Sequence, residues 1–222
     1  WHARSEATMA AVRPHLRGML GFMGHSAARA TLKLGNRNLD VLLLGHYRSA
    51  TEVGYYRIAR SLGGVALSFT DPLYFTVFPD FARSWVSDRA RFRALLKRTV
   101  GIGVAMAAPG VLLGLVLARP VFEIAVGEEY LPAVDPFRII LAAIGIAVAT
   151  FWATPAALGS GNPRVATTAF AVGVAAQLAA LFALVPGRGP EGAAFALLAF
   201  YLAWAVVMGA GLRLALKTRT AG

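Results

Sequence analysis

Long uncharged stretches dominate the second half of this 222-residue chain. Four stretches contain no charged residue: Thr99–Ala118, Ile139–Pro163, Val165–Gly187 and Gly192–Leu212. A helix that crosses the hydrocarbon core of a bilayer needs about 20 mainly apolar residues, and each stretch reaches that length. The pattern predicts four transmembrane helices over about 99–118, 137–159, 164–186 and 192–212.

Two further transmembrane helices are predicted in the first half, over about 18–45 and 53–79, although both carry charges. Their apolar content is still high, for example in Val41–Leu44 and Leu73–Phe75. With the four uncharged stretches they make about six spans. We therefore predict an all-α integral membrane protein in which residues 1–222 form a single transmembrane bundle.

Composition supports this class. The chain is 57% hydrophobic and 15% charged, whereas soluble domains carry about 25% charged residues. It has no cysteine, which excludes disulfides and thiolate metal sites. The formal net charge of +11 is typical of a membrane protein whose cytoplasmic loops collect Lys and Arg. No nucleic-acid-reading motif accompanies the charge, so nucleic acid is not a predicted partner.

The connections between the predicted helices alternate in charge. Basic residues gather at the start of the chain, in the second and fourth connections, and in the tail. With six spans these segments lie on one side of the membrane, and the positive-inside rule then places both termini in the cytoplasm. The first residue is Trp1 rather than Met, and we interpret the chain as a piece of a longer protein.

The second connection has a pattern of its own. Phe81, Trp85, Phe92 and Leu96 recur at roughly helical spacing among basic residues. This predicts an interfacial helix over 81–97 that lies in the headgroup region; a solvated linker is the alternative. The third connection, 121–136, carries glutamates and is interpreted as a solvated outer loop rather than a catalytic site.

Polar residues form a stripe along each of the two charged helices. On a helix with 100° per residue, the stripe of the first helix falls within an arc of about 120°, and that of the second is narrower. Charges within a membrane are costly and face a polar cavity or one another, so two such helices predict a shared cavity. The stripes are His25, Arg29, Lys33, Arg37 and Asp40, and Arg57, Arg60, Gly64, Ser68 and Asp71.

Depth relative to the turn between the two helices predicts ion pairs. Asp40 lies at the depth of Arg57 and Arg60, and Arg29 at the depth of Asp71. The cavity has five cations against two carboxylates, which favours an anionic substrate group, and Arg suits phosphate oxygens. The predicted substrate-binding residues are Arg29, Lys33, Arg37, Asp40, Arg57, Arg60 and Asp71.

Two alternatives to the cavity stay open. One is an interfacial amphipathic helix over residues 15–37 whose cations reach water, and the other is that Arg57 and Arg60 anchor a helix end. Asp71 is harder to explain in that way, because it lies among apolar residues inside the predicted span. Pro72 beside it leaves a backbone carbonyl free and predicts a kink. No nucleotide-binding loop, metalloprotease motif or nucleophile elbow is present and the histidines are scattered, so we predict no enzyme, no catalytic residue, no metal and no cofactor.

Several short motifs, in this order and spacing, resemble the polysaccharide flippases (O-antigen and teichuronic-acid type) of the multidrug/oligosaccharidyl-lipid/polysaccharide exporter superfamily. The resemblance covers roughly residues 14–215. The matching segments are Leu39–Gly45, Val53–Arg60, Phe78–Pro79, Gly127–Ala133 and Leu158–Pro163.

The resemblance implies a transporter for a lipid-linked oligosaccharide in the bacterial cytoplasmic (inner) membrane. In that family the pattern belongs to the C-terminal of two six-helix bundles, so the partners would be a polyprenyl-pyrophosphate sugar, membrane lipids and a missing N-terminal bundle of the same protein. Among the cavity residues, Arg60 is the clearest match to the family motif. Two other functions remain: an ion-coupled small-molecule or drug exporter of the superfamily, and a non-transporting membrane scaffold subunit. The surplus of cationic side chains in the predicted cavity argues against export of cationic drugs, and a scaffold needs no buried cationic stripe.

Overall fold

The computed structural model describes residues 23–24, 27 and 38–218. Most of the predicted helix over 18–45 lies outside the described residues, as do the predicted cavity residues Arg29, Lys33 and Arg37. The elements are α2 (Leu39–Tyr47), α3 (Ala50–Ser68), α4 (Thr70–Ser87), α5 (Arg89–Val121), η1 (Phe122–Val126), η2 (Glu128–Ala133), α6 (Val134–Ala149), α7 (Ala153–Gly159) and α8 (Pro163–Thr218).

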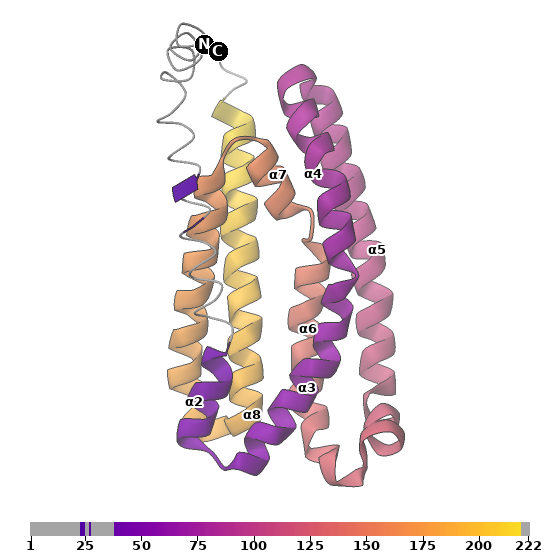
Figure 1. The fold of residues 1–222 in the computed structure, drawn as a ribbon, viewed down its shortest axis with the longest axis vertical. Coiled ribbons are helices and arrows are strands. Elements are labelled where there is room, and N and C mark those ends of the chain that lie inside the picture. Colours follow the sequence, from indigo (N-terminus) through magenta and orange to yellow (C-terminus); the bar gives the residue numbers. More distant parts are fainter. Residues whose placement is uncertain (1–22, 25–26, 28–37, 219–222) are drawn as a thin grey trace, which may run out of the picture.

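The described residues contain no strand, and the predicted all-α fold is confirmed. Within them, three helical stretches are long and apolar enough to cross a membrane: 89–126, 128–159 and 163–216. The last one is two antiparallel helices joined at Gly189, whose φ of 52° and ψ of −125° are not helical (Figure 1). Gly173 and Gly211 allow the halves to pack closely, because an added Cβ would lie 2.9 Å from Phe200 and 2.4 Å from Val165.

A break at Phe69 separates α3 from α4. Pro72 is the third residue of α4, where a missing N–H costs little because first-turn N–H groups have no helical acceptor. Its ring nitrogen cannot bond the carbonyl of Ser68, the residue at which α3 ends. The helix is therefore interrupted about one turn before Pro72, where the sequence predicts a kink.

Two other prolines have opposite effects. Residues 150–152 separate α6 from α7 one turn before Pro155, and the Thr150 hydroxyl donates to the Ile146 carbonyl at 2.5 Å there. The predicted single helix over 137–159 is therefore two helices. Pro109 lies inside α5, which continues from Arg89 to Val121.

The interfacial helix predicted over 81–97 is replaced by a hairpin. Helix α4 continues to Ser87, and Asp88 caps α5 by accepting from the N–H groups of Ala90 (2.8 Å) and Arg91 (3.1 Å). The aromatic side chains of this segment face the protein, whereas Val86 is exposed. Phe92 packs on Phe81 and Trp85, with ring centroids 5.3 Å and 4.9 Å apart, and all three are buried against small residues of α7.

Helix α6 lies at the centre of the bundle between α3, α5 and α8 (Figure 1). Ile140, Leu141 and Ile144 are buried there, and glycines of the neighbouring helices allow close approach. An added Cβ at Gly63 of α3 would lie 2.8 Å from Ile140, and one at Gly114 of α5 would lie 2.8 Å from Leu141. This packing holds α3 and its charged residues against the core.

The connections alternate between the two ends of the bundle (Figure 1). One end carries the Asp88 turn, the turn at 160–162 and the end of α8, and the other carries the α2–α3 turn, residues 122–133 and Gly189. The charges differ accordingly. Near the first end lie Arg83, Arg89, Arg91, Arg93, Lys97, Arg98, Arg164 and Arg213 against Asp80 and Asp88. Near the second lie Arg48, Arg119, Arg138 and Arg188 against Glu52, Glu123, Glu128, Glu129, Asp135 and Glu191.

Candidate functional site

A buried carboxylate connects α2 to α3. Asp40, in the first turn of α2, has no solvent exposure. The Tyr56 hydroxyl donates to its Oδ2 at 2.6 Å, and Arg60 forms an ion pair with its Oδ1. The Val41 N–H also donates to Oδ1 at 2.9 Å. These partners make burial of the charge tolerable, and we call Asp40, Tyr56 and Arg60 the Asp40 cluster.

Local sequence positions this cluster. Ser49 and Glu52 form a capping box that starts α3 directly after α2. Tyr56 and Arg60 are four residues apart and thus share one face of α3. Asp40 and Arg60 lie at comparable distances along the chain from the Arg48–Ser49 turn, so antiparallel helices bring them to the same depth.

Arg48 joins this turn to the turn of α8. Pro190 has no N–H and cannot bond the Pro186 carbonyl as a helix would require. The guanidinium of Arg48 takes that place: its Nη2 donates to the Pro186 carbonyl at 2.6 Å and its Nε to the Val185 carbonyl at 3.4 Å. Arg48 thereby fixes α2 and α3 against α8.

Burial differs among the predicted cavity residues. The Arg60 side chain is 29% exposed although its partner Asp40 is fully buried. Arg57, one turn earlier on α3, is exposed, and so is Asp71 on α4. The predicted ion pair of Asp40 is confirmed with Arg60. The predicted pairing of Asp71 with Arg29 lies partly outside the described residues and stays a prediction.

Tyr56 is the member of the cluster that sequence reasoning missed. The predicted stripes contain the charged and small polar residues, whereas a tyrosine counts as an apolar position in a membrane helix. Its position four residues before Arg60 was the available signal. A buried tyrosine hydroxyl needs a hydrogen-bond partner, and a carboxylate at the same depth on the neighbouring helix can accept it.

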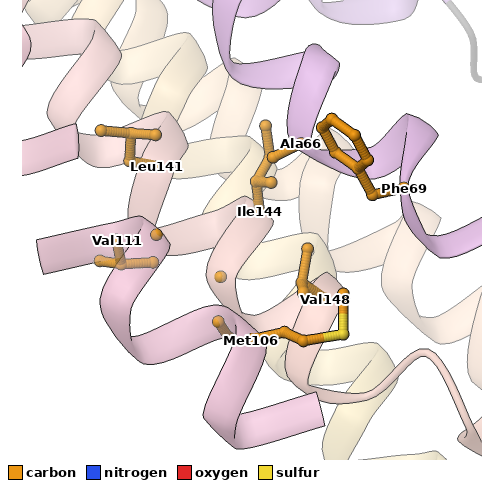
Figure 2. A pocket seen from close by; sticks show the side chains of 10 residues that line it. Ala66, Phe69, Met106, Val111, Leu141, Ile144 and Val148 are labelled. Atoms are coloured by element: carbon orange, nitrogen blue, oxygen red, sulfur yellow. The ribbon is translucent and has the colours of Figure 1, made fainter. Parts of the chain in front are cut away.

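An apolar pocket of about 270 Å³ lies on another side of the bundle, between the α3–α4 break, α5 and α6. Figure 2 shows Phe69, Met106, Val111, Leu141, Ile144 and Val148 around it. None of its lining residues is charged. The pocket therefore does not suit a phosphate, and the arginines of α3, Arg60 in the Asp40 cluster and the exposed Arg57, are the better candidates for contact with an anion.

The fold and this cluster define an all-α membrane protein with charge inside its bundle, and the comparisons with known proteins agree. A family model described as "Polysaccharide biosynthesis protein" matches residues 1–135, and the chain belongs to that family. It is similar to the teichuronic acid biosynthesis protein TuaB of Bacillus subtilis (strain 168), with 32% identity over 136 residues. That alignment covers 59% of this chain and 28% of TuaB. No solved structure matches the chain.

The family resemblance predicted from the short motifs is thus confirmed. The chain spans only a fraction of the relative's length, so its assignment to the C-terminal half of a two-bundle protein stays a prediction.

Proposed function

We propose that this chain is part of a membrane transporter that flips or exports a lipid-linked oligosaccharide or polysaccharide precursor. Membership of the polysaccharide biosynthesis family supports the substrate class. The observation that carries the proposal is the Asp40–Arg60 ion pair. The buried Asp40 carboxylate holds this guanidinium in place, and the Arg60 side chain is 29% exposed.

The anion in this proposal is the pyrophosphate of a polyprenyl carrier. Arg57 is exposed close to Arg60 on α3, and arginine forks bind phosphate oxygens in pairs. Arg29, Lys33 and Arg37 supply further cations in this proposal. Asp71 balances part of the charge, and the surplus of three positive charges over the whole set favours a multivalent anion.

Transport in this proposal needs no covalent chemistry, and the chain is not an enzyme. Binding of the pyrophosphate is followed by exposure of the site to the other face, through rocking of this bundle against a second, N-terminal bundle of the same protein. The proposed location is the bacterial cytoplasmic membrane with both termini in the cytoplasm. The cationic end formed by the Asp88 turn, the 160–162 turn and the end of α8 supports that orientation.

Arg57→Gln tests the proposal with little risk to folding, because the Arg57 side chain is exposed. We expect export of the glycan to fall about tenfold or more, since a charge-assisted hydrogen bond contributes roughly 1.5–3 kcal/mol. The measurement is surface glycan per unit of protein in the membrane, in a host whose export depends on the gene encoding this chain.

Arg119→Gln is the matched control. It also removes an arginine from a membrane helix. The Arg119 side chain lies near the C-terminal end of α5, is 68% exposed, and pairs with Glu123 at 2.7 Å. Export by this variant should equal that of the unmodified protein. Normal export by Arg57→Gln at normal abundance would argue against a phosphate-binding cavity on α3.

A further inference from the structure

A groove runs between the end of α4 and the start of α5, at the cationic end of the bundle. Arg83 and Asp80 of α4 line it, together with Arg91 and Arg98 of α5. Asp80 and Arg91 border both of its parts, which makes the groove continuous. We call this site the basic groove. It is separate from the Asp40 cluster, which lies between α2 and α3, toward the opposite end of the bundle.

The cations of the basic groove come from two helices and converge on it. Arg91 and Arg98 are seven residues apart, about 20° around α5, and so they share one face. Arg83 is oriented by Asp80, with 2.7 Å between Nη2 and Oδ1. Three arginines against one aspartate leave a surplus of two positive charges, which favours an anionic ligand.

Apart from Ser87, the wall of the groove between the charged residues is apolar. Ala82 and Val86 of α4 and Ala94 and Leu95 of α5 line it between the arginines, and Val86 is 87% exposed. A free inorganic anion gains nothing from such a wall. A ligand that carries both a phosphate and a hydrocarbon portion matches both parts of the lining.

The depth of the groove agrees with a lipid ligand. Arg98 is the last charged residue before the uncharged stretch 99–118, so it marks the edge of the hydrocarbon core on α5. Arg91 lies almost two turns further out, and the groove therefore spans the headgroup layer. Basic pockets between membrane helices at this depth bind phosphate headgroups.

We propose that the basic groove binds the phosphate headgroup of an anionic membrane phospholipid, with an acyl chain lying along the exposed apolar surface of α5 below Arg98. The bound lipid holds the α4–α5 hairpin at a fixed depth in the membrane. This site does not depend on the identity of the transported substrate.

The test is a titration of the purified chain with phosphatidylglycerol, followed by native mass spectrometry, with phosphatidylcholine as the zwitterionic comparison. We expect saturable binding of phosphatidylglycerol that is tighter than that of phosphatidylcholine. Arg91→Gln combined with Arg98→Gln should weaken it about tenfold or more, because two charge-assisted phosphate contacts are removed.

Arg93→Gln combined with Lys97→Gln is the matched control. Both side chains are exposed on the first turns of α5, on a different face from Arg91 and Arg98, and the charge change is identical. The affinity of this variant for phosphatidylglycerol should fall less than about threefold, because it loses only the general electrostatic attraction near the membrane surface. Equal weakening by the two double variants would overturn the proposal, because only net charge would then matter. Circular dichroism of both variants verifies that they are folded.

Inorganic phosphate separates a lipid site from a free-anion site. At millimolar concentration it should leave phosphatidylglycerol bound, because it cannot use the apolar wall. Displacement of the lipid by inorganic phosphate at concentrations comparable to those of the lipid would overturn the proposal, as would the absence of saturable phosphatidylglycerol binding.

Discussion

The Asp40 cluster and the basic groove contain the same chemical groups, arginine and aspartate, in opposite environments. Asp40 is fully buried and its partner Arg60 is 29% exposed, whereas Asp80 and Arg83 in the groove are 46% and 77% exposed. A buried pair must stay complete, because a lone buried charge is strongly destabilising. An exposed pair is screened by water and contributes little to folding. The comparison separates an arginine whose carboxylate partner is fully buried from an arginine whose partner is itself exposed to water.

Removal of the guanidinium from the buried pair should have the largest effect. Arg60→Gln leaves the Asp40 carboxylate without its counter-ion inside the bundle, and we expect a loss of about 3–5 kcal/mol in the free energy of unfolding. Denaturant unfolding in detergent micelles, followed by helical circular dichroism, measures it.

The double variant Asp40→Asn with Arg60→Gln is the control for this result, because it removes both charges together. We expect the double variant to regain about 1–3 kcal/mol of the stability that the single variants lose, which is the coupling energy of a contacting pair. Simple addition of the two single effects would mean that Asp40 and Arg60 do not stabilise each other.

Tyr56→Phe should have an intermediate effect. It keeps the ring that packs in the core and removes only the hydroxyl that donates to Asp40 at 2.6 Å. A hydrogen bond to a charged group contributes about 1.5–3 kcal/mol, and we expect a destabilisation within that range in the same unfolding assay. Tyr55→Phe, on the adjacent partly buried tyrosine of α3, is the matched control and should change stability less.

Arg83→Gln should have the smallest effect on stability. Its ion pair with Asp80 lies three residues apart on one helix and is largely exposed, so we expect a change of about 0.5 kcal/mol or less. Unfolding at low and high salt measures this, and the small difference should shrink as salt rises. A loss comparable to that of Arg60→Gln would remove the distinction between the two regions.

The helical fold could be predicted from the chain because its signals are local. The uncharged stretches 99–118, 165–187 and 192–212 lie in long helices, Pro72 marks the α3–α4 break, and the break in α8 falls at Gly189, inside the predicted connection of residues 187–191. Pro109 shows the limit of this reasoning, since α5 accommodates it without a break. Whether a proline ends a helix depends on what packs against the freed carbonyl, and that information is not local.

The candidate site could be predicted only in part. The stripes of charge placed Asp40 at the depth of both Arg57 and Arg60, but spacing does not distinguish between two arginines less than one turn apart. Packing of α3 on α6 turned Arg60 toward α2 and left Arg57 exposed.

The sequence by itself determined that this chain is a bundle of apolar helices with a few costly charges inside, because length, hydrophobicity and charge are properties of each segment alone. Tertiary structure decided what covers each face. The apolar face of residues 81–97 fits a membrane surface as well as a protein core, and packing in one cluster with residues of α7 and α8 placed Trp85 and Phe92 in the core. Arg48 likewise looks like an ordinary turn residue until α8, 137 residues away in sequence, presents the carbonyls that it bonds. An amphipathic pattern predicts that one face of a helix is buried. The residues that bury it come from distant parts of the chain and cannot be predicted from that helix alone.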